Sequence, residues 1–405
     1  MNEAGRQSVD YLVGGFRISI GPESTTPGPR THIVAFVEAL RQSGTRVRTV
    51  LASDLPFLSR FARVQQSDYV GAAGWKIHAA DVVRVGAAIW SGMCVFALSA
   101  TAPAPSVIYE RVAVLQSLSS FHRFKRRAVR IVEANGVLSR ETAQDRKVLR
   151  AERLATALER HVLRRADLVV AVSTALKTEL VQHAGIAPSK VLVVPNGVSD
   201  AFFDAVRVER SSDRVTIGFV GSVVAWQHLD EFLEAVQDVR RARTDGRRIA
   251  VEIVGEGGDL ARLERMVTDR GWTGSVTFLG RLPHEDALQR MRSWDLGFAG
   301  HRRSSSASMY HSPLKLYEYA ALGLIVVCTP SADATALAAS GASLHTFEER
   351  SGLEGALRSA LADLDRSTAE EMAERRERVR QSHSWRARTE LLMRTVASGE
   401  TGSAA

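Results

Sequence analysis

The chain has 405 residues, of which 45% are hydrophobic, so it can form about two globular domains and is not a disordered chain. A formal net charge of +8 favours anionic partners such as phosphates, nucleic acid or an acidic membrane surface, without choosing among them. Both cysteines, Cys94 and Cys328, lie in apolar surroundings, which excludes a disulfide framework and a cysteine-based metal cluster. Because the N-terminus, Met1–Arg6, lacks a basic-then-apolar signal pattern, we expect a cytoplasmic protein.

The N-terminal half opens like a Rossmann-like domain, with a strand, a loop, a helix and a second strand. The expected ranges are Tyr11–Gly15, Ile18–Pro29, Arg30–Gly44 and Arg46–Leu51, in that order. The loop does not carry the GxGxxG fingerprint. Gly28 within it either allows a close backbone approach to a ligand or is a simple turn glycine, and both interpretations stay open.

The longest stretch without a charged residue lies between Arg84 and Glu110. Its apolar part, Val85–Leu98, raises the question of a membrane span. However, Gly, Ala and Ser dilute it, and Pro103 and Pro105 cut it below the roughly 20 apolar residues that a span requires. We therefore predict a core helix here, followed by a turn and a buried strand.

Basic and aromatic side chains gather next, in Phe121–Arg130. Such a patch can meet a membrane surface or an anionic acceptor, but it can equally be a solvated face of the fold. Its basic residues are Arg123, Lys125, Arg126, Arg127 and Arg130.

The strand and helix pattern continues through the rest of this half. One long, charged helix is predicted over Arg140–Arg165. Further strands are expected at Ser106–Tyr109, Val129–Glu133, Asp167–Ser173 and Val191–Pro195, and a helix at Thr174–Gln182.

A polar, aperiodic segment at residues 199–213 separates the two halves and is predicted to be a hinge. We therefore expect an N-terminal domain of residues 1–198 and a C-terminal domain of residues 214–383. Residues 384–405 are expected to form a helix that packs back on the N-terminal domain, and a frayed tail. Repeated strand and helix steps in the second domain predict a parallel sheet covered on both faces. Its strands are expected at Val215–Val220, Ile249–Val254, Val276–Leu279, Asp295–Ala299 and Leu324–Cys328.

The stretch at residues 311–319 has the signature of a helix start that binds an anion. Ser312 is a good N-cap and Pro313 suits the first helical turn. Free N–H groups and the positive end of the helix dipole then face out of the fold, and Lys315 adds a charge. Glu318, about one turn deeper, can accept hydrogen bonds from hydroxyls. A ligand with a phosphate at the helix start and a diol beside Glu318 would be a nucleotide sugar. The same residues also fit an ordinary capped helix with a surface lysine and glutamate.

Several motifs occur together in an order that resembles glycosyltransferase family 4, which has the GT-B fold. That fold is α/β, with two Rossmann-like parallel-sheet domains facing each other across a cleft. The similarity covers roughly Tyr11 to Val396, and it is the order and spacing of the motifs that make it specific. Its motifs are Val220–Ser222, Trp226–His228, Val254–Gly257, Phe278–Pro283 and Ser312–Tyr319, with Tyr109–Arg111, Glu133–Asn135, Ala166–Lys177 and Val194–Val198 upstream.

The resemblance implies a retaining transferase that moves a sugar from a nucleotide-diphosphate sugar to an acceptor hydroxyl in cell-envelope glycan, polysaccharide or glycolipid synthesis. Lys315, Glu318 and His228 are the implied catalytic residues, with Glu318 on the ribose hydroxyls. No cofactor or metal is expected, because Lys315 and a helix dipole can stabilise the leaving diphosphate. The implied donor-binding residues are Gly221, Ser222 and Gly255 at the diphosphate, Arg281 and Leu282 at the base, and Ser312, Pro313 and Leu314 at the sugar. Acceptor-side candidates are Gly28, Arg30, Arg111, Glu133 and Asn135.

Two positions depart from the family pattern. Many members carry a Glu where this chain has Tyr310, and many carry a Lys where it has Gln227 and His228. His228 can hydrogen-bond a diphosphate, or it can simply begin the next helix. No residue stands out as a nucleophile, since Glu110 and Glu133 can both be structural. We therefore expect same-face attack, in which the departing phosphate takes the acceptor proton.

Three alternatives remain at this stage. The acceptor can be a secondary-metabolite aglycone instead of a glycan or lipid. A nucleotide-sugar 2-epimerase has a similar pair of domains, and a catalytically silent partner would only bind the donor. Nucleic acid is not an expected partner, because acidic residues interleave with the basic ones in the 140–165 segment. The expected partners are the nucleotide-sugar donor and an acceptor. We also expect the protein to contact an anionic membrane peripherally, at the inner face of that membrane.

Overall fold

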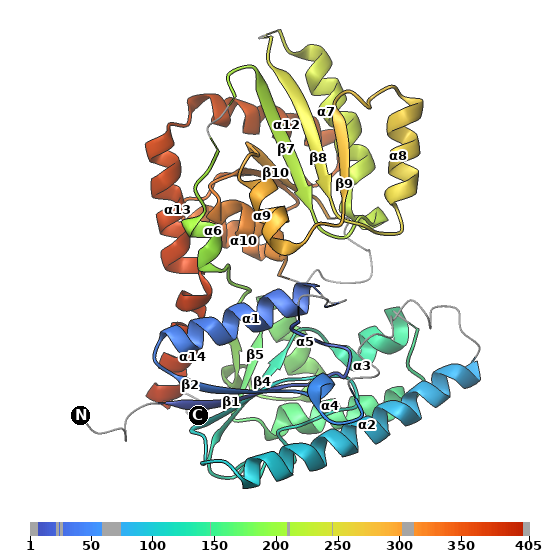
Figure 1. Cartoon of the computed structure of the whole chain (residues 1–405), viewed down its shortest axis with the longest axis vertical. Helices are drawn as coiled ribbons and strands as arrows, with labels where there is room; N and C mark the ends of the chain where they lie inside the picture. Colours follow the sequence, from blue (N-terminus) through green and yellow to red (C-terminus); the bar gives the residue numbers. More distant parts are fainter. Residues whose placement is uncertain are drawn as a thin grey trace. The chain divides into compact units, whose positions relative to one another are not determined.

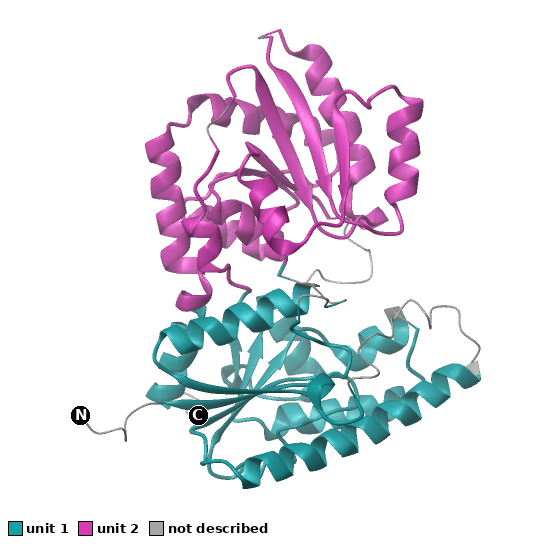
Figure 2. Ribbon diagram, in the orientation of Figure 1, with its two compact units in different colours: residues 1–195, 310–312, 388–405 teal, residues 196–309, 313–387 magenta. Residues whose placement is uncertain are grey.

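The chain forms two compact units, shown in a computed structural model (Figures 1 and 2). The structure describes residues 7–21, 24, 27–58, 74–145, 147–208, 211–244, 246–301 and 312–399. Unit 1 comprises residues 1–195, 310–312 and 388–405, and unit 2 comprises residues 196–309 and 313–387. Each unit has its own six-stranded parallel sheet, so the predicted pair of Rossmann-like α/β domains is confirmed.

Unit 1 has its strands in the order β2-β1-β3-β4-β5-β6, and every neighbouring pair is parallel. Helices make the crossover between successive strands except between β3 and β4, which are joined by turns over residues 112–128. The strands are β1 (Ser8–Val13), β2 (Arg46–Leu51), β3 (Val107–Arg111), β4 (Val129–Ala134), β5 (Leu168–Ala171) and β6 (Val191–Val193). The helices are α1 (Pro27–Gln42), α2 (Gly74–Ala100), α3 (Leu138–Arg140), α4 (Glu152–Arg165) and α5 (Thr174–Ala184).

Alternate residues of β1 and β3 face opposite layers of unit 1. On one face, Tyr11 and Tyr109 pack against Phe36 of α1, with ring centroids 5.5 and 4.9 Å from it. On the other face, Leu12 belongs to a core cluster that includes Val95 of α2. The sheet is therefore covered on both sides, as expected of a Rossmann-like domain.

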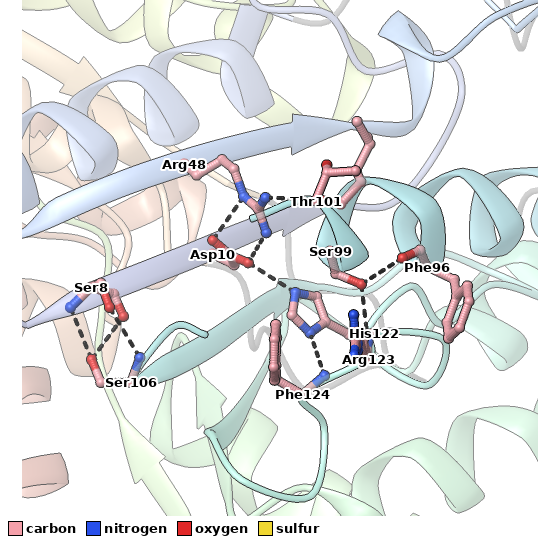
Figure 3. Close-up of polar contacts among 11 residues, drawn as sticks. Ser8, Asp10, Arg48, Phe96, Ser99, Thr101, Ser106, His122, Arg123 and Phe124 are labelled. Carbon is pink, nitrogen blue, oxygen red and sulfur yellow. Dashed lines mark hydrogen bonds and ion pairs between the residues drawn. The ribbon is translucent and has the colours of Figure 1, made fainter. Parts of the chain in front are cut away.

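A buried polar network joins β1, β2 and the segment after β3 (Figure 3). The Asp10 carboxylate accepts a hydrogen bond from Nε of Arg48 at 2.9 Å and lies 2.8 Å from Nε2 of His122. Because His122 Nδ1 accepts the backbone N–H of Phe124 at 3.2 Å, Nε2 is the nitrogen that donates to Asp10. Burial raises the pKa of Asp10, but the hydrogen bonds from His122 and Arg48 outweigh it and leave the pKa below its ordinary value.

Two helix predictions in unit 1 are corrected. The charged pattern at residues 140–165 is not one helix, because a break lies between α3 and α4. There the backbone N–H groups of Arg150 and Ala151 donate to the Asp81 carboxylate at 2.8 and 2.9 Å, instead of continuing a helix. The helix predicted to be a core helix is α2, which is longer than expected and leaves one apolar face exposed.

Unit 2 has its strands in the order β12-β11-β10-β7-β8-β9, again all parallel. The strands are β7 (Arg214–Val220), β8 (Arg248–Val254), β9 (Val276–Gly280), β10 (Leu296–Ala299), β11 (Ile325–Cys328) and β12 (Leu344–Thr346). The helices are α6 (Asp200–Asp204), α7 (Leu229–Ala242), α8 (Leu260–Asp269), α9 (His284–Met291), α10 (Leu314–Ala321), α11 (Ala332–Ala339), α12 (Arg350–Arg366) and α13 (Ala369–His383).

The sheet of unit 2 also separates two cores. Ile325 and Val327 of β11 pack with Phe232 of α7, whereas Val326 and Cys328 pack in the cluster that contains α10. Four consecutive buried apolar residues in β11 therefore serve two layers, which is typical of a strand inside a parallel sheet.

The connections between the units include short pieces of structure. The segment predicted as a hinge contains α6, whose Phe202 and Phe203 are buried in the core cluster with α10. The last helix, α14 (Trp385–Ser398), begins within unit 2, and residues 388–405 cluster with unit 1.

Candidate functional site

Two glycine turns meet at the carboxyl ends of neighbouring strands in unit 2. Gly221 follows β7 with φ 139°, and Gly255 follows β8 with φ 141°. A Cβ atom on Gly255 would lie 1.8 Å from the carbonyl oxygen of Gly221, so no larger residue fits. The Gly221 N–H donates to Val254 at 3.0 Å, and the Gly255 N–H donates to Gly280 at 2.8 Å. The turns after β7, β8 and β9 are thus tied together at the edge where ligands bind in open α/β sheets.

The start of α10 differs from the prediction by one residue. The N-cap is Pro313, with φ −75° and ψ 116°, and it makes no side-chain capping bond. Ser312, predicted as the N-cap, is buried just before it, and Leu314 begins the helix. The extended ψ of Pro313 explains the shift, because that residue does not yet have helical geometry. In the first turn of α10 the Leu316 N–H donates to the carbonyl of Pro313 at 3.2 Å, whereas the N–H groups of Leu314 and Lys315 have no helical partner among the described residues. Anion binding at this helix start therefore stays a prediction.

Lys315, in the first turn of α10, brings its ammonium to the turn after β7. Its Nζ donates to Oε1 of Gln227 at 2.9 Å and lies 4.0 Å from the centroid of the Phe219 ring. A Cβ atom on Gly221 would lie 3.1 Å from the same Nζ. The structure therefore brings together three predicted residues of unit 2, namely Gly221, Gly255 and Lys315. It also adds Gln227 as the partner of the lysine.

Glu318 lies one turn further along α10 and is half-buried. Within the described residues its carboxylate has no hydrogen-bonding partner. Burial raises the pKa of Glu318 to about 7, although Lys315 opposes the rise. Burial likewise lowers the pKa of Lys315 to about 7, against the pull of Glu318. Glu318 is thus a half-buried carboxylate that can still accept hydrogen bonds, and it lies next to a lysine that loses its proton easily. Such a pair is suited to bind a polar ligand.

His228 begins α7 in the left-handed region, with φ 56°. Its Nδ1 lies 2.8 Å from Oε2 of Glu231, and its ring packs edge-on against Phe347 at 5.8 Å. Because Glu231 occupies Nδ1, a ligand would have to use Nε2. The structure thus shows His228 at the helix start, while its predicted contact with a diphosphate stays a prediction.

The three remaining donor-side candidates lie at the ends of neighbouring strands. Ser222 is exposed and follows Gly221 in the turn after β7. Arg281 is also exposed and comes directly after β9, where Gly280 has φ 64°. Leu282 packs against the core cluster that contains α10. All three therefore belong to the same carboxyl edge of the sheet as the glycine turns.

In unit 1, Glu133 is the centre of a dense polar cluster. Its carboxylate is 1% exposed and accepts hydrogen bonds from Tyr109 at 2.9 Å, Arg111 at 2.5 Å and Asn135 at 2.6 Å. Nε2 of His32 lies 3.3 Å from Oε1 of the same carboxylate. Burial raises the pKa of Glu133, but His32 and Arg111 outweigh it and hold the pKa well below the usual range. The structure thus brings together the predicted residues Arg111, Glu133 and Asn135.

His32 was not predicted from the sequence. It is 6% exposed and lies in α1, directly after the loop that follows β1. That position, at the carboxyl edge of a predicted parallel sheet, is the signal that could have indicated it.

The other acceptor-side candidates are less constrained. Gly28 lies in α1 instead of the predicted loop, because the helix begins at Pro27. A Cβ atom there would meet no described atom within 4 Å, so the described surroundings do not require glycine. Arg30 donates from Nε to the carbonyl of Ile20 at 3.1 Å. Its contact therefore holds the loop after β1.

Glu110 proves to be committed to the fold of unit 1. It is 0% exposed and accepts the backbone N–H of Leu118 at 2.5 Å and of Ser119 at 3.1 Å. These bonds fix the turn after β3. Of the two carboxylates considered as nucleophiles, Glu110 is thus occupied by backbone donors and Glu133 by side-chain donors.

Tyr310 and His311, both considered in the sequence analysis, lie outside the described residues. Among the residues that are described, no group of three or more His, Cys, Asp or Glu side chains lies close enough together to hold a metal ion.

Comparison with known proteins agrees with this geometry in both units. Residues 28–202 match the family described as Glycosyltransferase Family 4, and residues 202–378 match Glycosyl transferases group 1. The chain is a family 4-like glycosyltransferase. The second match includes both glycine turns, Lys315 and Glu318. The first match includes Glu133 and the side chains around it.

Two curated relatives illustrate the range of this family. The chain is 29% identical over 163 residues to a phosphatidylinositol N-acetylglucosaminyltransferase component from Arabidopsis thaliana, in a match that covers 40% of this chain and 34% of that protein. It is 31% identical over 156 residues to the 2-deoxystreptamine glucosyltransferase of Streptomyces kanamyceticus, in a match that covers 35% of this chain and 39% of that protein. Each match thus spans less than half the length of the relative.

The fold of this glycosyltransferase is GT-B. A crystal structure of Anabaena HepE in complex with UDP and glucose matches with a TM-score of 0.58 at 14% identity, covering 97% of this chain and 100% of that one. At this level of identity the match shows the fold alone.

Proposed function

We propose that this protein is a retaining glycosyltransferase that moves a sugar from a nucleotide-diphosphate sugar, bound by unit 2, to a hydroxyl of an acceptor. The observation that carries the proposal is the carboxyl edge of the unit 2 sheet. There Lys315 lies against the Gly221 turn, next to a half-buried Glu318 that has no hydrogen-bonding partner among the described residues. A diphosphate suits the first group and the two hydroxyls of a ribose suit the second.

The same groups account for catalysis. As the bond between the sugar and the phosphate breaks, negative charge grows on the departing diphosphate. The Lys315 ammonium and the free N–H groups at the start of α10 stabilise that charge more strongly in the transition state than in the bound donor. We propose that no metal or cofactor is required, because these groups supply the positive charge. Chelation with EDTA should then leave turnover unchanged.

Retention of configuration is proposed through attack from the face that the diphosphate leaves. Glu110 is held by backbone N–H groups and Glu133 by several side chains, so neither is well placed to serve as a nucleophile. In this scheme the acceptor oxygen bonds to the sugar carbon, the carbon–oxygen bond to the phosphate breaks, and the phosphate oxygen takes the hydroxyl proton. The product anomer, identified by NMR, tests this directly. An inverted product would contradict it.

We propose that the acceptor binds to the side chains around Glu133 in unit 1 and that Arg111 and Asn135 contact it directly. The leading acceptor class is a lipid-linked or polysaccharide precursor. We propose that the protein acts on it as a cytoplasmic enzyme at the inner face of the membrane. The Arabidopsis relative, named for phosphatidylinositol, supports a lipid acceptor. The Streptomyces relative, named for 2-deoxystreptamine, supports a secondary-metabolite aglycone as the second candidate.

A nucleotide-sugar panel tests the proposal. Thermal shift against UDP-linked and GDP-linked sugars should show a stabilising donor, and the complex of HepE with UDP makes UDP-sugars the first choice. Incubation with that donor alone then separates the rivals. An epimerase would convert it into an equilibrium mixture with its epimer, a transferase should hydrolyse it only slowly, and a silent binding protein would leave it intact even with acceptors present.

A further inference from the structure

The longest helix of unit 1, α2 (Gly74–Ala100), presents an exposed apolar stripe along its length. Trp75, Val82, Ile89, Met93 and Phe96 are 69%, 72%, 53%, 57% and 55% exposed. Successive members are separated by seven, seven, four and three residues, which places them within one narrow face of an α-helix. Ala79, Gly86, Ala97 and Ala100 fall on the same face and are also exposed, so the face carries no Asp, Glu, Lys or Arg. The exposed His78 lies at its border.

The opposite face of α2 is anchored to unit 1. Asp81 is 5% exposed and accepts the N–H groups of Arg150 and Ala151, while Arg84 pairs with Asp81 and donates to the carbonyl of Val148 at 2.8 Å. By length and composition, Trp75–Ala100 is long and apolar enough to cross a membrane. A span would, however, place this ion pair and its backbone partners in hydrocarbon, where charged and unsatisfied polar groups are costly. The anchoring therefore favours a helix that stays on the protein.

A basic segment borders the apolar stripe at the C-terminal end of α2 (Figure 3). The backbone N–H of Arg123 donates to Oγ of Ser99 at 3.1 Å, and the Phe121 ring packs so closely on α2 that a Cβ atom on Gly92 would lie 2.5 Å from it. No acidic residue occurs between Glu110 and Glu133. The exposed basic residues of this segment are Arg123, Lys125, Arg126 and Arg127.

Further aromatic side chains widen the stripe. Phe57 is 67% exposed and packs edge-on against Trp90 of α2 at 5.7 Å. At the other end of the helix, the Lys76 ammonium lies 5.8 Å from the ring of Trp75. Aromatic and basic side chains together at the edge of an apolar face are typical of helices that lie in a membrane interface.

We propose that the α2 face, defined as the apolar stripe of α2 together with the basic segment 123–127, docks unit 1 on an anionic membrane surface, with α2 lying in the plane of the interface. The stripe provides apolar area for the acyl boundary, and the basic segment provides the complementary charge for acidic headgroups. A second copy of the chain is a poorer occupant, because self-association through this face would bring basic segments together. The inference locates the membrane contact of the proposed function on specific residues.

Vesicle binding by the purified full chain tests the proposal. In co-sedimentation, we expect at least tenfold stronger binding to vesicles containing phosphatidylglycerol than to phosphatidylcholine vesicles, and a loss of that binding as NaCl is raised. Equal binding to both vesicle types, or no binding to either, would overturn the proposal.

Three variants locate the surface. Ile89→Asp and Met93→Asp should each reduce binding at least tenfold, because each places a charge in the apolar stripe. Val208→Asp is the matched control, since Val208 is 51% exposed, as Ile89 is 53%, but lies in unit 2. It should bind as the unchanged protein does. Circular dichroism should show the same fold for all three, and an equal loss in the control would refute the assignment to α2.

Two further measurements exclude the competing occupants. Sodium carbonate should release the protein from vesicles, whereas retention would indicate a membrane span. Light scattering should give a monomer that Ile89→Asp does not alter, whereas a dimer lost in that variant would assign the face to a second copy. Donor hydrolysis without vesicles reports on the proposed function separately, so failure of either proposal can be told from failure of the other.

Discussion

Each unit buries a glutamate beside a cation, but the two glutamates are treated in opposite ways. Glu133 in unit 1 has three hydrogen-bond donors and His32 around it, and its pKa is held below the ordinary value. Glu318 in unit 2 has no hydrogen-bonding partner among the described residues, and burial raises its pKa to about 7. A satisfied carboxylate stabilises the fold, whereas an unsatisfied one has capacity left for a ligand. The comparison therefore predicts that the same substitution will affect stability in unit 1 and donor binding in unit 2.

The largest expected effect follows Glu133→Ala. Removing this carboxylate leaves the Arg111 guanidinium, which is 9% exposed, without its counter-charge. The free energy of unfolding should fall by about 3–5 kcal/mol, the usual result of breaking a buried ion pair. Urea denaturation followed by circular dichroism measures it.

Acid should reveal the same contribution in the unchanged protein. Because the folded-state pKa of Glu133 is lowered from an ordinary value of 4.5, its stabilisation is present above that pH and is lost as the pH falls below it. A stability loss under 1 kcal/mol in the Ala variant would show that unit 1 does not depend on this cluster, which would remove the contrast.

Lys315→Ala should mainly affect turnover. If the ammonium stabilises charge that develops as the donor bond breaks, kcat should fall about 10²-fold or more while donor affinity changes much less. Steady-state kinetics together with calorimetry of donor binding separates the two quantities. Equal losses in both would instead assign Lys315 to ground-state binding.

Glu318→Ala should weaken donor binding by about 1.5–3 kcal/mol, the value of hydrogen bonds to a charged group. Stability should not fall, because the carboxylate has no hydrogen bonds among the described residues and is costly to bury. Calorimetry and urea denaturation on one preparation test both halves of this prediction. Glu354→Ala, at a partly exposed position of α12 where the carboxylate pairs with Arg358, is a suitable control. Unchanged donor affinity in the Glu318 variant would contradict the site.

The smallest expected effect is a pH dependence of donor affinity. A lysine with a pKa of about 7 is half protonated at pH 7 and about one-tenth protonated at pH 8, so affinity for the diphosphate should fall over that interval by at most about fivefold, the limit for a site in which only the ammonium form binds. Binding must then take up a proton, which calorimetry in two buffers of different ionisation enthalpy detects. Glu318→Gln isolates the lysine. A pH-independent affinity in that variant would place the lysine outside the diphosphate site.

Local sequence patterns were sufficient for much of the architecture. The predicted strand Arg46–Leu51 has the bounds of β2, because its residues lie between clear turn signals. Lys315 was singled out from the helix-start pattern at residues 311–319, whereas the glycine turns were named through the resemblance to glycosyltransferase family 4.

The predictions failed where contacts with residues distant in the sequence determine the backbone conformation or the burial of a side chain. Nothing within residues 140–165 shows that Asp81 binds the N–H groups of Arg150 and Ala151, so the break in that helix was not predictable from its own pattern. The exposed face of α2 was missed because apolar composition alone does not distinguish a core helix from one with an uncovered side. His32 was missed because its partner Glu133 is far away in the sequence.

The position of the Lys315 amine, held by Gln227 above the Phe219 ring, has a chemical consequence. A lysine that loses its proton near neutral pH is a nucleophile under mild conditions. Amine-acylating reagents at pH 8 should therefore modify Lys315 faster than exposed lysines such as Lys125. A nucleoside diphosphate that occupies the site should protect it, so peptide mapping by mass spectrometry would give a footprint of donor binding without any knowledge of the acceptor.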